Sequence, residues 1–323
     1  MTDTSCPDEI PRLEGLTRQR FVDEYLRFQQ PFVLTEESST WPAVRDWSLD
    51  HLAMTHHDHE VLVEYYPSAR RSDAYTYTRM TVGEYIHRVQ SEPEARRRFY
   101  LADTSIESTL PRLKDDVGIP SVIESTEGLR TGLFFGFDTF SATHYHRFCE
   151  QALLVQISGC KEVSLYPAKQ LSKTSPHPWY GLRTNFSRIE MEFDTHREQA
   201  ERHMRITPLR CILQPGEMLF IPDHWMHTVA GPGENISLTY FWPESLRHCY
   251  VPGVARDLLS SLNKTTLLAA ARIGRRLGIQ DSMLNLAIRL GVVPDAEREA
   301  VEQHLDEFSG HLPNQVKTAG ASR

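Results

Sequence analysis

The sequence predicts a mainly β fold with flanking α-helices, built around a sandwich or barrel of the jelly-roll type. Between Thr131 and Pro243 most segments have the length and residue types of strands, and turn signals separate them at short intervals. The segments before and after this region carry helix caps and a helical spacing of apolar residues. Many short strands in one central block are typical of a jelly roll, so we expect a β core with helices on both sides.

The central block holds the expected strands of the core. They are Gly132–Phe137, Ala142–His146, Ala152–Ile157, Glu162–Tyr166, Arg210–Leu213, Met218–Ile221 and Asn235–Trp242. Alternation in the last of them places large apolar side chains on one face, namely Ile236, Leu238, Tyr240 and Trp242. The excursion Ser172–Thr207 is longer than an ordinary loop, and its polar part Met191–Arg205 is expected to be helical.

The N-terminal part is expected to alternate short helices and strands. Thr17 is a suitable N-cap for a helix over residues 16–32, and Ser48 for a second helix. Thr81 and Glu84 have the spacing of a capping box at the start of a third helix. Short strands are expected at Pro31–Thr35, Glu60–Tyr66 and Phe99–Ala102.

Helical spacing returns after Pro252. The expected helices run from Val254 to Leu277, from Asp281 to Leu290 and from Asp295 to Phe308. We therefore expect a main domain over residues 13–250, with its β core at about 131–243, and a C-terminal helical segment over residues 251–310. Residues 1–12 and 311–323 are expected to be flexible tails.

Composition excludes several classes of protein. The 14 Phe, 12 Tyr and 5 Trp are too many for a disordered chain, and no stretch approaches the ~18 apolar residues of a membrane span. The formal net charge is −8, which argues against nucleic acid as a partner because nucleic-acid binding favours a basic surface. A small-molecule or peptide substrate is expected instead.

The cysteines and the N-terminus both point to the cytoplasm. Met1–Asp8 is polar and acidic, so no secretory signal is expected. The five cysteines are odd in number, widely spaced and without a CxxC pair, so we expect reduced thiols.

The strongest chemical signal is a set of histidines. His144 and His146 are two residues apart on an expected strand, so their side chains share a face and can bind one metal ion. His227 follows 81 residues after His146, and a barrel brings such distant strands together. Histidine ligands with open positions suit oxygen chemistry, with Fe(II) as the leading metal. Glu150 is a conditional fourth ligand, because it reaches the metal only if the chain turns at residues 147–149.

Further motifs carry a family resemblance over residues 21–242. They are Phe32-Val33-Leu34, Trp41-Pro42-Ala43, Trp47-Ser48, Phe99–Asp103, Thr143–His146, Gln156–Val163, Pro215-Gly216-Glu217, Phe220-Ile221-Pro222 and His227. In this order they resemble the cupin-like, JmjC-type family of Fe(II)/2-oxoglutarate-dependent oxygenases. The resemblance implies a double-stranded β-helix (the cupin jelly roll), N-terminal α/β elements and a C-terminal helical appendage that forms a homodimer.

The resemblance also implies roles for single residues. His144 is the first metal ligand and His227 the last, and His146 occupies the position between them. Lys161, in Gly-Cys-Lys-Glu, matches the lysine that pairs with the distal carboxylate of 2-oxoglutarate. Tyr100 and Ser141 lie near positions that help to bind the same cosubstrate. The implied enzyme is a non-haem iron dioxygenase of the hydroxylase type, which uses O₂ and converts 2-oxoglutarate to succinate and CO₂.

One residue departs from the family pattern. His146 stands where the family usually has Asp or Glu. The broader cupin pattern of His-x-His-x3-Glu fits residues 144–150 as well, with His224 and His227 in the second motif. This second reading predicts a three-His or three-His-one-Glu dioxygenase that needs no 2-oxoglutarate. A third reading is a cupin-like binding protein whose site has lost its activity.

Overall fold

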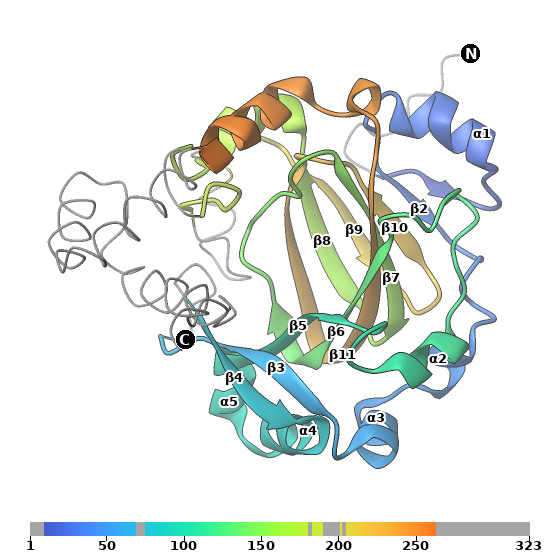
Figure 1. Cartoon of the computed structure of the whole chain (residues 1–323), viewed down its shortest axis with the longest axis vertical. Helices are drawn as coiled ribbons and strands as arrows, with labels where there is room; N and C mark the ends of the chain where they lie inside the picture. The colour runs from blue at the N-terminus through green and yellow to red at the C-terminus, as the bar shows by residue number, and fades with distance from the viewer. Residues whose placement is uncertain (1–9, 69–74, 180–182, 190–200, 202–204, 263–323) are drawn as a thin grey trace, which may run out of the picture. The chain divides into compact units, whose positions relative to one another are not determined.

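An eleven-stranded sheet forms the centre of the computed structural model, which describes residues 10–68, 75–179, 183–189, 201 and 205–262 (Figure 1). The strands are β1 (Arg12–Leu13), β2 (Phe32–Leu34), β3 (Glu60–Tyr65), β4 (Thr76–Thr81), β5 (Phe99–Ser105), β6 (Arg130–Phe140), β7 (Glu150–Ser158), β8 (Lys161–Tyr166), β9 (Leu209–Leu213), β10 (Met218–Ile221) and β11 (Met226–Pro243). The α-helices are α1 (Arg18–Arg20), α2 (Pro42–Asp46), α3 (Leu49–His56), α4 (Val82–Ser91) and α5 (Pro93–Arg98). The π-helix is η1 (Phe21–Leu26), and the 3-10 helices are η2 (Pro111–Asp116), η3 (Ala168–Thr174) and η4 (Leu246–His248).

The long strand β11 connects two layers of strands. Its first residues, Met226–Ala230, pair antiparallel with β8, which also pairs with β9. Its later residues, Ile236–Pro243, pair with β7, and β6 lies along its other edge. The register shifts between Gly231 and Glu234, where the strand passes from one layer to the other. The predicted mainly β, jelly-roll fold with flanking helices is confirmed.

Alternation in β7, β10 and β11 separates two apolar cores. Ala152 and Leu154 of β7 pack in one cluster with residues of β8 and β9, between the two layers of strands. The intervening residues of β7 pack in the larger cluster with the N-terminal helices. The predicted shared face of β11 is confirmed, because the four residues predicted to lie on it all belong to this larger cluster: Ile236, Leu238, Tyr240 and Trp242.

The N-terminal caps form where the sequence predicts them. Thr17 accepts from the backbone N–H of Arg20, and Ser48 accepts from that of His51. Thr81 and Glu84 form the complete capping box of α4. The first helix is shorter than predicted, however: η1 ends at Leu26, and Gln29 adopts a left-handed conformation (φ 53°) that turns the chain into β2.

The predicted strand Ala142–His146 is wrong. Only His144 forms β-bridges there, one with His227 and one with Phe186. Phe148 and Cys149 both have positive φ angles, so the chain turns and enters β7 at Glu150. The segment 141–149 is therefore a loop between β6 and β7, which we call the histidine loop.

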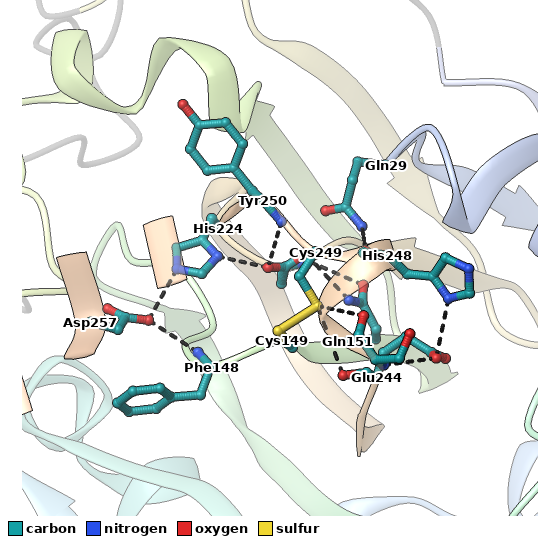
Figure 2. Close-up of a disulfide and its surroundings, with 12 residues drawn as sticks. Gln29, Phe148, Cys149, Gln151, His224, Glu244, His248, Cys249, Tyr250 and Asp257 are labelled. Carbon is teal, nitrogen blue, oxygen red and sulfur yellow. Dashed lines mark hydrogen bonds and ion pairs between the residues drawn. A yellow bond between two sulfur atoms is a disulfide. The ribbon is translucent and has the colours of Figure 1, made fainter. Parts of the chain in front are cut away.

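The cysteine prediction is wrong for one pair. Cys149 and Cys249 form a disulfide although they lie 100 residues apart in sequence (Figure 2). Cys160 and Cys211 are free thiols. The wide spacing gave no sign of the pair, because β11 and η4, which bring Cys249 to the histidine loop, lie between the two cysteines in sequence.

The C-terminal part of the described chain is a helix over residues 251–262. Pro252 lies in its first turn, where a missing N–H is tolerated. Within the described residues no helix is long and apolar enough to cross a membrane. The later helices, the dimerisation surface, the helix Met191–Arg205 and both tails lie wholly or mostly outside the described residues.

Candidate metal centre

Three histidine side chains converge between the histidine loop and β11. The backbones of His144 and His227 are joined by hydrogen bonds in both directions, with N···O distances of 3.1 and 2.8 Å. Their ring centroids are 4.4 Å apart, and the ring of His146 lies 4.7 Å from that of His227. Each of the three residues offers a ligand atom within 4.8 Å of the other two. This spacing suits one metal ion.

Backbone carbonyls orient two of the rings. Nδ1 of His144 lies 2.7 Å from the carbonyl of Ala142, and Nδ1 of His227 lies 2.9 Å from that of Trp225. A carbonyl only accepts, so each Nδ1 carries the proton and each Nε2 keeps a lone pair for a ligand bond. Nδ1 of His146 is buried without a hydrogen-bond partner. An orphaned imidazole nitrogen beside two oriented ones fits a metal ion that completes its bonding.

Burial controls the charge of these rings. It lowers the pKa of His144 and His146, and it lowers the pKa of His227 to about 3. All three imidazoles are therefore neutral near pH 7, which is the form that binds metal. Three neutral ligands leave a divalent ion with its full charge.

Lys161 is a buried lysine at the start of β8. It is 3% exposed, its Nζ donates to Oγ of Ser237, and it lies 5.5 Å from the ring centroid of Phe134. Among the residues that the structure describes, no carboxylate lies within ion-pair distance of Nζ. Burial lowers the pKa of Lys161 to about 7. A buried ammonium group without an acidic partner suits a bound anion.

One cavity of about 350 Å³ brings the predicted site residues together. Its lining includes seven of the residues that the sequence singled out for the site, but not His224: Tyr100, Ser141, His144, His146, Glu150, Lys161 and His227. Ser141 is fixed by its backbone N–H and its Oγ, which bond the carbonyl and the N–H of Val229. Tyr100 is contributed by β5 and is 6% exposed.

Glu150 has another partner. The chain does turn before it, and its backbone N–H donates to the carbonyl of Arg147. Its carboxylate, however, lies 3.5 Å from Nη2 of Arg130, which also pairs with Asp103. The group of close ligand atoms contains the three histidines without Glu150.

The sequence did not indicate several residues of the cavity wall. Arg130 is the first residue of β6, and its Cζ lies 4.0 Å from the ring centroid of Phe241. Its guanidinium group carries the charge that faces Glu150. Asn185 and Phe186 come from the excursion after β8, and the ring of Phe186 stacks on His144 at 5.6 Å. Pairing between two irregular segments has no sequence signature, so only the structure reveals this part of the wall.

A jelly roll with clustered histidines inside it defines a cupin-type metal-binding fold. A sequence profile of the cupin-like domain matches residues 18–248, which is more than half of the chain. The chain therefore belongs to the cupin-like domain family.

Curated relatives agree with this family. The chain is 27% identical to lysine-specific demethylase 8 of Xenopus tropicalis, over 72% of this chain and 52% of the relative. It is 26% identical to Jumonji C domain-containing protein 5 of Drosophila melanogaster, over 75% of this chain and 62% of the relative. It is 24% identical to tRNA wybutosine-synthesizing protein 5 of Gallus gallus, over 75% of this chain and 79% of the relative. The chain spans about half the length of the demethylase, and the resemblance to the cupin-like, JmjC-type family is confirmed.

Proposed function

We propose that this protein is an Fe(II)/2-oxoglutarate-dependent oxygenase that hydroxylates a C–H group of a small molecule, an amino acid or a peptide. One observation carries the proposal: Lys161, a buried amino group with no carboxylate partner among the described residues, lines the same cavity as three convergent imidazoles. A metal-chelating dicarboxylate would use both features at once. The relatives named as demethylases and as a Jumonji C protein support the same class.

The histidines are the residues that would hold the iron. His144 and His227 present their Nε2 atoms, and His146 lies between them in the family's ligand order. Their neutral state matches the requirement of a divalent ion. When bound, iron and 2-oxoglutarate would supply oxidising chemistry in which O₂ converts the cosubstrate to succinate and CO₂ and the substrate to an alcohol.

The protein's own groups would bind and orient the cosubstrate. Lys161 would pair with its distal carboxylate, and Tyr100 and Ser141 lie on the same cavity wall. An ammonium group suits this role because it acts as a compact point charge. The anion would restore to Lys161 the charge that burial disfavours.

The substrate would enter between two parts of the chain. The cavity wall includes Glu64 and Tyr66 of the N-terminal part, and Asn185 and Phe186 of the excursion after β8. A cavity of about 350 Å³ is at the small end of ligand pockets, which suits a metabolite or one side chain of a peptide. The net charge of −8 favours such substrates over nucleic acid.

The test is anaerobic loading with Fe(II), followed by calorimetric titration with 2-oxoglutarate and measurement of succinate after O₂ is admitted. We expect binding and slow succinate formation from the wild type. Lys161→Met should lose most of the affinity, whereas Lys169→Met, at an exposed position in η3, should retain it. Iron-loaded protein that neither binds 2-oxoglutarate nor forms succinate would contradict the proposal.

A second candidate is a three-His cupin dioxygenase that needs no 2-oxoglutarate. His146 favours it, because the close group of ligand atoms contains no carboxylate. Under this candidate the iron-loaded protein would oxidise its substrate with O₂ in the absence of 2-oxoglutarate. Lys161→Met would then leave this activity unchanged. Iron content below ~0.1 equivalent, with no binding on titration, would instead favour a non-enzymatic binding protein.

A further inference from the structure

The histidine loop is held in place by a carboxylate from outside the β core. Asp257 lies on the helix over residues 251–262 and its side chain is fully buried. Its Oδ1 accepts from Oη of Tyr145 at 3.1 Å and from Nε of Arg147 at 3.0 Å. Its Oδ2 accepts from the backbone N–H of Phe148, also at 3.0 Å (Figure 2).

These contacts flank His146 on both sides. Tyr145 and Arg147 are its immediate neighbours, and both donate to the same oxygen of Asp257. The residues on either side of His146 are therefore anchored to one buried carboxylate, which restrains the backbone that carries His146. Nη2 of Arg147 also donates to the backbone carbonyl of Asp257.

His224 joins the clamp to β11. Its backbone N–H donates to the carbonyl of His146 at 3.1 Å, and its ring stacks on Tyr145 at 5.0 Å. Its two ring nitrogens lie 2.7 Å from Asp223 and 3.0 Å from Asp257, so the ring bridges the two buried carboxylates. Arg147 forms an ion pair with Asp257 in the same network.

The helix is shaped for this contact. A side chain at Gly253 would place its Cβ 2.2 Å from the ring of His224, so only glycine lets the helix approach so closely. The Cys149–Cys249 disulfide ties the end of the same loop to the residues just before the helix. Within the described residues this loop has only single β-bridges, at His144, so its conformation depends on these tertiary contacts.

We propose that Asp257 is a positioning residue, which fixes the histidine loop so that His144 and His146 meet His227 at metal-binding distance. This inference rests on the proposed metal site. It predicts that part of the metal affinity comes from a residue that never touches the metal, because outer hydrogen-bond partners typically contribute ~10–100-fold.

The test is anaerobic titration of the full chain with Co(II), followed through the visible absorption of the bound ion. We expect Asp257→Asn to lower the Co(II) affinity ~10-fold or more and to change the spectrum. Tyr85→Phe is the matched control. It removes a buried hydroxyl that donates to the carbonyl of Phe135 in the β core, so it should reduce stability without changing the spectrum.

A milder variant covers the case in which Asp257→Asn fails to fold. Tyr145→Phe removes one donor to Asp257 and keeps the ring, and it should weaken Co(II) binding several-fold. The positioning role, but not the metal site, would be overturned if Asp257→Asn kept the wild-type Co(II) affinity and spectrum. Tyr145→Phe decides in the same way if only that variant folds. A wild type that binds no Co(II) would overturn both this role and the proposed metal site.

Discussion

His144 and His227 lie 83 residues apart, yet each donates its backbone N–H to the carbonyl of the other, at 3.1 and 2.8 Å. This bridge joins the histidine loop to the start of β11 and sets two imidazoles 4.4 Å apart, with His146 completing the group.

Removal of a central imidazole should abolish the metal site. His227→Ala deletes the ring that lies within 5 Å of both other rings, so we expect at least a 100-fold loss of Fe(II) affinity under anaerobic titration. His146→Asp should retain binding, because it supplies the carboxylate that the family usually has there. The control is His87→Ala at an exposed position of α4. Unchanged iron binding in His227→Ala would rule out the three-histidine site.

Glu150 distinguishes the two ligand sets. Its carboxylate faces Arg130, so Glu150→Ala should change metal affinity by less than ~3-fold and act instead on substrate binding. Under the three-His-one-Glu alternative the same variant should lose the metal. Iron titration of Glu150→Ala and Glu150→Gln decides between them, and loss of binding in both would make Glu150 a ligand.

The affinity for 2-oxoglutarate should fall as pH rises. The cosubstrate carboxylate requires charged Lys161, whose pKa burial lowers to about 7 in the empty protein. Above pH 7 each unit should therefore reduce affinity by up to about tenfold, with proton uptake on binding. Calorimetry between pH 6 and 9, in buffers of different ionisation enthalpy, measures both effects. Affinity that stays flat with pH would mean that Lys161 does not bind the anion.

The same lysine should give stability a pH dependence. Its folded pKa of about 7 is below the unfolded value of 10.5, so the unfolded chain binds more protons between these values. Unfolding free energy therefore rises with pH in this window, by roughly 1.4 kcal/mol per unit from this group. The unfolding free energy of Lys161→Met should lack that rise. The variant's unfolding free energy should exceed that of the wild type by the largest amount below pH 7. Urea titrations from pH 6 to 9 measure the difference, and parallel curves would contradict it.

The disulfide should be detectable by thiol counting. In denaturant without reductant, alkylation should label Cys160 and Cys211 but not Cys149 and Cys249, which should be labelled only after reduction. Because the bridge closes a loop of 100 residues, the double variant Cys149→Ser/Cys249→Ser should lose roughly 2–5 kcal/mol of stability. Labelling of Cys149 and Cys249 without reductant would show that the pair is reduced.

Much of the β core could be predicted from sequence, because all side chains on one face of a strand pack in the same surroundings. The alternation in residues 236–242 reports that environment directly, and the capping box of Thr81 and Glu84 depends only on local spacing. Seven predicted site residues also line one cavity, because the jelly roll brings together strands and loops that are far apart in sequence.

The rest depends on contacts between distant, irregular segments. The strand predicted over Ala142–His146 is a loop whose shape depends on Asp257 and on the Cys149–Cys249 bridge. Neither partner has a sequence pattern that points to this loop. The pairing of Glu150 with Arg130 is equally non-local, which is why spacing alone suggested a ligand.

The most direct test of the proposed function is a crystal structure of the protein with Fe(II) and a non-reactive mimic of 2-oxoglutarate, grown without oxygen. We expect one ion bound by His144, His146 and His227, with the distal carboxylate of the mimic on Nζ of Lys161. An ion bound by Glu150, or a mimic whose distal carboxylate lies away from Lys161, would contradict it.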